Sequence, residues 1–88
     1  MIERDAIIPN PLGLHARPAA QLVKLAATFA CDIQLEKDGV VVNGKSILGV
    51  MMLSAECGST LRIRANGSDE AAAVLALAEL VATGFGEM

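Results

Sequence analysis

The sequence has almost no aromatic residues and no excess of positive charge. Its 88 residues contain no Trp and no Tyr, and two Phe residues make up the whole aromatic share of 2%. The formal net charge is −3. A nucleic-acid interface needs a basic surface, and proteins that bind single strands also stack bases on aromatic side chains. The composition therefore argues against a nucleic-acid partner.

Long apolar segments are also missing, although 53% of the residues are hydrophobic. A membrane-spanning helix needs about 18 or more consecutive apolar residues, and charged or polar residues interrupt the apolar stretches of this chain before that length. The segment Met1–Asp5 carries charges of both signs and no apolar core, unlike a secretory signal. We therefore expect a cytoplasmic protein that does not insert into a membrane.

Residues that bind metals are scarce as well. The chain has one His and two widely separated Cys residues, Cys31 and Cys57. A structural zinc site usually takes four His or Cys ligands in closely spaced pairs. We therefore expect no metal site. In a reducing compartment thiols stay free, and we interpret both Cys as small, buried apolar residues.

The residues that are present predict one small α+β domain over residues 1–88. Alternating apolar residues indicate strands, and apolar residues spaced by three or four indicate helices. The expected elements are a strand Ile2–Ile8, a helix Ala16–Ala30, two hairpin strands Asp32–Lys37 and Val40–Val42 joined by Asp38-Gly39, a short helix Ile47–Leu53, a strand Thr60–Ala65, and a last helix that Ser68 or Asp69 caps and that reaches about Thr83.

This order, β-α-β-β-α-β-α, suits a four-stranded antiparallel sheet with three helices on one face. The polar positions of the strands should then form the other, solvated face of the sheet. They include Glu3, Asp5, Arg62 and Arg64.

The only histidine lies where a loop meets a helix. Pro11 and Gly13 belong to the loop, and Pro18 fits the first turn of a helix but not its interior. We therefore expect His15 at or just before a helix N-terminus, where free N–H groups and the helix dipole favour an anion such as phosphate. Arg17 adds a positive charge whose planar fork binds phosphate oxygens. These residues predict a phosphoryl group carried on His15.

Ser46 precedes the predicted short helix and is a favourable N-cap residue. The segment Gly39–Ser46 also matches the P-loop pattern, in which a flexible loop cradles nucleotide phosphates. Three valines stand where that loop should be, and they favour a strand. We therefore interpret the P-loop match as accidental.

The short helix has more apolar residues than one buried face requires. They are Ile47, Leu48, Val50, Met51, Met52 and Leu53. An exposed apolar patch often marks a partner site, and Met side chains adapt to partners of different shape. We therefore expect a protein-docking surface on this helix.

Two blocks of the chain resemble the HPr family, the histidine phosphocarriers of the bacterial phosphotransferase system. They are Gly13–Pro18 and Asn43–Leu53, and the region from Gly58 to Leu61 with the following helix is also similar. The resemblance spans essentially all 88 residues. It implies the open-faced β-sandwich of that family, in agreement with the predicted order of elements.

The resemblance also implies a function. Such a carrier accepts phosphate on Nδ1 of His15 from enzyme I, with Arg17 assisting, and passes it to enzyme IIA-type domains. It needs no cofactor, has no independent turnover, and is expected to be a monomer. Ser46 would be a regulatory site in bacteria that possess an HPr kinase/phosphorylase. The residues implied in docking are Ala16, Ala20, Lys24, Lys45, Ile47, Leu48 and Met51, whereas Val50 and Leu53 are expected in the core.

Two other functions stay open. The nitrogen branch of the family, NPr, uses the same histidine chemistry for regulation rather than sugar uptake. The segment Gly84–Glu87 has some similarity to that branch, whereas Lys45–Ile47 is more similar to the sugar branch. A binding-only regulator controlled through Ser46 is the other alternative, but such relatives lack the histidine that this chain keeps.

Overall fold

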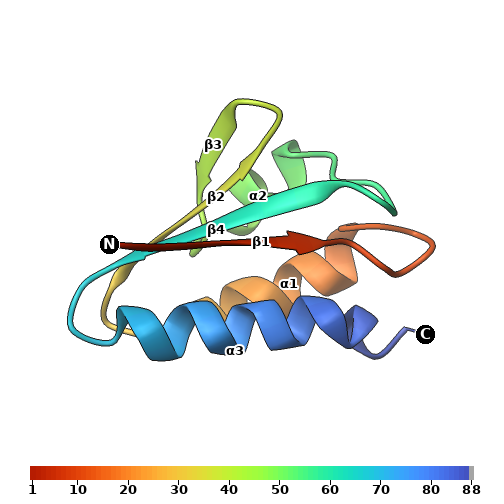
Figure 1. Ribbon diagram of the computed structural model, residues 1–88. Coiled ribbons are helices and arrows are strands. Elements are labelled where there is room, and N and C mark those ends of the chain that lie inside the picture. The colour runs from red at the N-terminus through yellow and green to blue at the C-terminus, as the bar shows by residue number, and fades with distance from the viewer. Residues whose placement is uncertain (88) are drawn as a thin grey trace.

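The computed structural model describes residues 1–87 and consists of a sheet with helices packed against it (Figure 1). The elements are β1 (Ile2–Ile7), α1 (Ala16–Ala26), β2 (Asp32–Lys37), β3 (Val40–Asn43), α2 (Ile47–Met52), β4 (Thr60–Asn66), α3 (Glu70–Ala82) and a single 3₁₀ turn, η1 (Gly84–Gly86). The predicted α+β class and the order of its strands and helices are confirmed.

The strand order β1-β4-β2-β3 determines where the loops lie. All neighbouring strands are antiparallel, and Ile7 at the end of β1 pairs with Thr60 at the start of β4. The loop after β1 therefore lies beside the loop before β4. Two backbone bonds join these loops, from Gly58 N to Ile8 O at 2.8 Å and from Ile8 N to Ser59 O at 2.9 Å.

The hairpin of β2 and β3 is also confirmed, with Lys37 paired to Val40. Asp38 and Gly39 have φ values of 51° and 83°. A two-residue type I′ turn requires positive φ at both central positions, and its twist matches that of the flanking strands. Because Val40–Asn43 form a strand, the valines of the P-loop match do not form a phosphate loop.

Small aliphatic side chains fill the space between the sheet and the helices. In β2 and β4 the buried residues alternate with more exposed ones and point to this side: Ile33, Leu35, Leu61, Ile63 and Ala65. α1 and α3 lie next to each other under the sheet (Figure 1) and contribute Ala19, Leu22, Ala73, Leu77 and Val81 to the same core. α2 adds Val50, which is fully buried as predicted.

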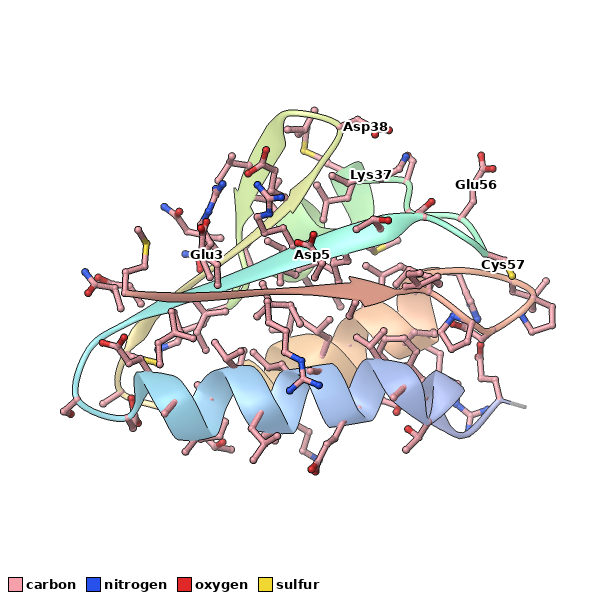
Figure 2. All side chains as sticks on the ribbon, in the orientation of Figure 1. Glu3, Asp5, Lys37, Asp38, Glu56 and Cys57 are labelled. Carbon is pink, nitrogen blue, oxygen red and sulfur yellow. The ribbon has the colours of Figure 1, made fainter. Side chains whose placement is uncertain are left out.

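The opposite face of the sheet carries ion pairs between neighbouring strands. Arg62 Nε donates to Asp5 Oδ1 at 2.9 Å, and Arg64 binds Glu3 and Glu36. Glu3 and Asp5 both lie on β1 (Figure 2). The bond from Arg64 lowers the pKa of Glu3, and the bond from Arg62 lowers the pKa of Asp5. The prediction of a solvated, charged face is confirmed.

The first helix is shorter than predicted, since it ends at Ala26 rather than Ala30. The next residues continue as tighter turns, with Thr28 N bonded to Leu25 O and Phe29 N to Ala26 O. The Asp69 carboxylate accepts from the N–H groups of Ala30 and Cys31 at 2.8 and 2.9 Å. Because these donors are used in another bond, they do not extend the helix.

Asp69 is the N-cap residue of α3, one of the two predicted positions. Its side chain does not cap that helix, because both carboxylate oxygens accept from Ala30 and Cys31. The bonds from Ala30 and Cys31 lower the pKa of Asp69. The neighbouring Glu70 instead accepts from Gly67 N at 3.3 Å and pairs with the amino group of Met1 at 3.1 Å. One acidic side chain thus ties α3 to the end of α1, and the other ties it to the start of β1.

Across residues 1–87, each helix is too short or too polar to cross a membrane.

Candidate functional site

The loop before α1 is fixed against the loop before β4. Leu14 N donates to Ala55 O at 2.8 Å, and Gly13 N donates to Asn10 O at 3.0 Å. Gly13 has a φ of +67°, and a Cβ atom at this position would lie 2.5 Å from Ala55 O. Only glycine fits here, because other residues disfavour this φ and have a Cβ that would meet the carbonyl. This close approach holds Leu14, the residue before His15, against Ala55 in the loop before β4.

His15 is the N-cap residue of α1, as predicted. Its φ and ψ of −77° and −172° are extended, and its carbonyl accepts the first helical bond, from Ala19 N at 2.9 Å. Pro18 has no N–H. Of the first-turn donors, those of Ala16 and Arg17 have no hydrogen-bond partner within residues 1–87. These two N–H groups lie at the positive end of the helix dipole, where an anion is favoured.

The imidazole of His15 is 37% exposed, and its two nitrogens have different surroundings. Nε2 lies 2.8 Å from Oε2 of Glu87. Nδ1 has no hydrogen-bond partner in the described part of the chain, residues 1–87. Nδ1 is therefore the nitrogen available to bind an incoming group.

Glu87 is a site residue that sequence reasoning missed. It lies 72 positions from His15, and no periodicity or motif connects the two residues. The sequence did show a Gly-Phe-Gly segment just before Glu87. That segment signals a chain reversal but does not tell which residue the following side chain will contact.

Arg17 lies on the exposed surface of the first turn of α1. Among residues 1–87 it has no ion-pair partner. Its guanidinium charge is thus not compensated by a protein carboxylate, and it lies two residues from His15. This arrangement agrees with the predicted role in binding an anion, and the role itself stays a prediction.

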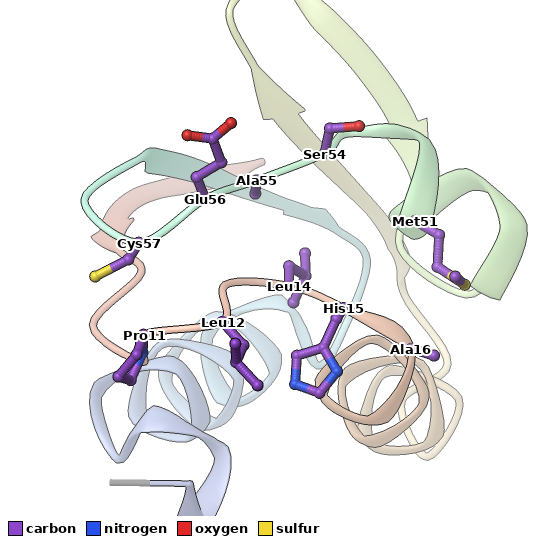
Figure 3. A pocket seen from close by; sticks show the side chains of 10 residues that line it. All are labelled: Pro11, Leu12, Leu14, His15, Ala16, Met51, Ser54, Ala55, Glu56 and Cys57. Atoms are coloured by element: carbon purple, nitrogen blue, oxygen red, sulfur yellow. The ribbon is translucent and has the colours of Figure 1, made fainter.

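An open, shallow pocket of about 590 Å³ lies beside the His15 ring (Figure 3). Ala16 and Met51 border it from α1 and from α2. The remaining lining residues come from the two joined loops: Pro11, Leu12, Leu14, Ser54, Ala55, Glu56 and Cys57. The structure therefore brings His15 together with one predicted docking residue from each of two helices.

The exposed side of α2 is apolar, as the sequence predicted. Leu48 is 74% exposed, and Ile47 and Met51 are each 41% exposed. Met52, 76% exposed, belongs to the same surface although the prediction did not include it among the docking residues. The exposed residues Ala16, Ala20 and Lys24 follow one another at every fourth position along α1. These three residues therefore share one face of α1, and Ala16 at its start borders the same pocket as Met51.

Lys45 and Ser46 are both half-buried at the start of α2, and both side chains form hydrogen bonds. Lys45 Nζ donates to Phe29 O at 2.7 Å. Ser46 Oγ accepts from Gly49 N at 3.2 Å, so the predicted N-cap is confirmed. Ser46 therefore caps the short helix, and Lys45 ties the segment before it to the segment after α1.

The two cysteines differ, and the prediction of two buried thiols is wrong for one of them. Both are free, but Cys31 is buried whereas Cys57 is exposed. Burial raises the pKa of Cys31. Cys57 lies in the loop before β4, beside the pocket, and its Sγ is 3.6 Å from Pro9 O. A position in that loop, rather than in a strand or helix, explains why its side chain is not covered.

Within residues 1–87, no three His, Cys, Asp or Glu side chains gather closely enough to hold a metal ion.

Known proteins resemble the chain over almost its full length. Residues 2–83 match the family model described as "PTS HPr component phosphorylation site". A phosphocarrier protein HPr of Cupriavidus necator is 47% identical over 87 residues, which is 99% of this chain and 98% of that protein. The HPr of Treponema pallidum is 42% identical, with 99% of both chains covered.

A solved structure gives the same result. The crystal structure of HPr-C-His from Thermoanaerobacter tengcongensis superposes with a TM-score of 0.96 at 44% identity, covering 100% of this chain and 99% of that one. The four-stranded sheet, the histidine at an open helix start and these matches lead to one conclusion. The chain belongs to the HPr family of phosphocarriers of the phosphotransferase system.

Proposed function

We propose that the protein accepts a phosphoryl group on Nδ1 of His15 from phosphorylated enzyme I and passes it to an enzyme IIA-type domain in the cytoplasm. The observation that carries this proposal is the position of His15 at the open start of α1, where Nδ1 has no hydrogen-bond partner among residues 1–87. The N–H groups of Ala16 and Arg17 follow His15 directly in the chain and have no partner within residues 1–87. They and the Arg17 guanidinium would balance the charge of the phosphoryl oxygens.

The protein needs little chemistry of its own for this role. A phosphoryl group in transfer is stabilised mainly by position and by electrostatic contacts. The N–P bond forms on His15 and breaks again when the group leaves, so no net reaction is catalysed by the carrier alone. The donor protein supplies the phosphoryl group in the first step, and the acceptor protein supplies the group that takes it in the second.

The direct test is incubation of the purified protein with enzyme I and labelled phosphoenolpyruvate, followed by identification of the labelled residue. We expect one acid-labile, base-stable phosphoryl group, on His15. Label on another residue, or no label, would show that the proposal is wrong. Enzyme IIA domains of the sugar and nitrogen branches, offered as acceptors in turn, then distinguish the two branches by the rate of transfer.

We further propose that the partners dock on a surface beside His15 whose apolar residues are Ala16, Ala20, Ile47, Leu48 and Met51 and whose cations are Lys24 and Lys45. Leu48, on α2, is 74% exposed. Leu48→Ser should weaken binding of enzyme I measured by titration calorimetry. Leu75→Ser is the matched control, because Leu75 is 51% exposed on α3, outside this surface. Sedimentation of the free protein tests the expected monomer.

Regulation through Ser46 stays a prediction. The hydroxyl caps α2 next to the exposed residues Ile47 and Leu48, so a phosphate there would add charge to the surface where partners are expected to dock. Incubation with an HPr kinase/phosphorylase and ATP tests whether Ser46 is modified. A binding-only role would require modification of Ser46 together with no phosphorylation of His15.

A further inference from the structure

The chain turns back sharply after α3 and brings Glu87 to the loop before α1, where it contacts Asn10 and His15. Three consecutive residues, Gly84, Phe85 and Gly86, have positive φ values of 67°, 57° and 75°. A left-handed conformation is uncommon for a bulky residue such as Phe and costs about 1 kcal/mol or more. Phe85 is only 3% exposed and belongs to the hydrophobic core. Burial of this ring offsets the strain and fixes the direction in which the chain continues.

The Glu87 carboxylate is held at both oxygens, and its side chain is only 15% exposed. Oε2 lies 2.8 Å from Nε2 of His15. Oε1 accepts from Nδ2 of Asn10 at 2.9 Å. The same Nδ2 donates to Gly13 O at 2.7 Å. Asn10 therefore links the carboxylate to the loop that positions His15.

Asn10 has no accessible surface and is the one fully buried polar side chain of the core region within residues 1–87. Two acceptors, Gly13 O and Glu87 Oε1, face the same atom of its side chain. That atom must be the NH₂ group, since an amide oxygen in its place would be repelled by both. The side-chain oxygen of Asn10, Oδ1, has no hydrogen-bond partner among residues 1–87. A buried amide is thus kept with one unpaired oxygen while its NH₂ group holds Glu87, which indicates a role beyond packing.

We propose that Glu87, oriented by Asn10, is a positioning residue that keeps the proton of His15 on Nε2 and so leaves the lone pair on Nδ1. An ionised carboxylate can only accept hydrogen bonds. The imidazole must therefore present an N–H group at Nε2, and its Nδ1 becomes the nucleophile. This inference rests on the proposed function, because it concerns how His15 accepts the phosphoryl group.

The proton on Nε2 of His15 serves both the uptake and the release of the phosphoryl group. When the Nδ1 lone pair forms the bond to phosphorus, the bond from phosphorus to the donor breaks and its electron pair leaves with the donor. The imidazole ring then carries a positive charge, which the adjacent carboxylate stabilises. When the group moves on, the N–P electron pair returns to Nδ1. The ring leaves as neutral imidazole because Nε2 has kept its proton.

Replacement of Glu87 by Gln gives the sharpest test of this arrangement. The NH₂ group of Asn10 needs an acceptor, so the new amide should turn its oxygen toward Asn10 and its own NH₂ group toward His15. Nε2 would then have to accept, and the proton would move to Nδ1, where it blocks the attack. Glu87→Ala removes the carboxylate without imposing this wrong tautomer. We therefore expect Glu87→Gln, the closer match in size, to be the more damaging change.

The experiment combines two readouts on the full chain. The first is the ¹⁵N–¹H correlation spectrum of the His15 ring at a pH of about 8.5, where an imidazole is neutral. The second is the initial rate of phosphorylation by enzyme I. We expect an Nε2–H ring in the unaltered protein, an Nδ1–H ring in Glu87→Gln, and a rate more than about tenfold lower in that variant. The rate of Glu87→Ala should fall between the two.

Glu79→Gln is the matched control, since it removes the same charge from an exposed position of α3 and should change neither readout. Thermal melts of all variants show that they are folded. The inference is overturned if His15 of the unaltered protein is phosphorylated but Glu87→Gln keeps its tautomer and rate, or is no slower than Glu87→Ala. If the unaltered protein is not phosphorylated on His15, the proposed function fails instead, and the spectrum still reports separately on Glu87.

Discussion

α1 and α2 both follow an N-cap residue with extended backbone, His15 and Ser46, but the two N-cap side chains make different bonds. At α2 the Ser46 side chain accepts from Gly49 N, so the helix start is closed by its own N-cap residue. At α1 the His15 side chain makes no such bond and turns toward Glu87. The N-cap side chain of α2 therefore stabilises its helix. At α1, where we propose that phosphate binds, the N–H groups of Ala16 and Arg17 have no partner within residues 1–87.

The approach to the two helix starts is similar. In each case a glycine lies two positions before the N-cap residue, Gly13 before His15 and Gly44 before Ser46, and packs against another segment. Gly44 N donates to Ile33 O at 2.8 Å on β2. The residue after Gly13 is bonded to the loop before β4. Both N-cap residues are therefore fixed by contacts outside their own helices, and the difference between the two starts lies in the N-cap side chain.

The largest effect is expected from removing the ring at the open helix start. His15→Ala should reduce labelling by enzyme I to background, more than about a thousandfold, because the variant lacks the nucleophile. Within residues 1–87 the partly exposed ring pairs only with Glu87, so the thermal midpoint should change by no more than a few degrees. A labelling assay and a thermal melt measure the two quantities. Persistent labelling of the folded variant would place the acceptor elsewhere.

A second prediction concerns the glycines that precede the two helices. In Gly13→Ala the new Cβ would lie 2.5 Å from a backbone oxygen, that of Ala55, at a φ of +67°. In Gly44→Ala it would lie 2.6 Å from the Ile33 side chain, with no left-handed backbone. We expect Gly13→Ala to destabilise the fold by about 2–4 kcal/mol and Gly44→Ala by about 1–2 kcal/mol, measured by urea unfolding.

Gly39→Ala is the control for that comparison. Its φ is +83°, but nothing lies within 4 Å of the new Cβ, so only the cost of the left-handed backbone, about 1 kcal/mol, should appear. If Gly13→Ala were no worse than Gly39→Ala, the contact with Ala55 would not be what fixes the loop before His15.

The sequence predicted both helix starts because each depends on neighbouring residues. Pro18 restricts where α1 can begin, and Ser46 supplies an acceptor within three residues of its donor, so local chemistry is sufficient. The bond from Asp69 to the end of α1 was not predictable in this way. It joins residues 38 and 39 positions apart, and it explains why α1 is shorter than its apolar pattern indicated.

The contact between His15 and Glu87 was the most difficult to foresee. It depends on Phe85 adopting a positive φ, which the residue type disfavours. Only the packing of the completed core makes that conformation favourable, because the Phe85 ring is buried against residues from other elements. Residue patterns therefore placed His15 at a helix start, but its contact with Glu87 emerged only from the three-dimensional structure.

A third prediction tests the closed helix start. Ser46→Ala removes the acceptor for Gly49 N and should destabilise the fold by about 1 kcal/mol. The rate of His15 phosphorylation should not change, since the altered bond lies within α2. Urea unfolding and the enzyme I assay measure the two effects. A lower phosphorylation rate in a fully folded variant would show that the start of α2 also takes part in the transfer or in docking.

The smallest effect is expected at the third helix start, where Asp69 bonds the end of α1 instead of capping α3. Its bonds to Ala30 and Cys31 lower the pKa of Asp69. The stabilisation is therefore fully present above the ordinary carboxyl pKa of about 4 and is lost as the pH falls through the lower, folded-state value. The lowered pKa values of Glu3, Asp5 and Glu70 act in the same direction.

Asp69→Asn should thus have a lower thermal midpoint than the unaltered protein at pH 7, with the gap narrowing in acid as the Asp69 carboxylate takes up its proton. The new amide can accept only one of the two backbone bonds, and its NH₂ group faces the other donor unfavourably. Melting curves collected from pH 7 down to about pH 2 measure the gap. Glu79→Gln loses the same charge on the same helix without losing either bond. A constant gap for Asp69→Asn, like that of the control, would mean that the two backbone bonds do not depend on the charge of Asp69.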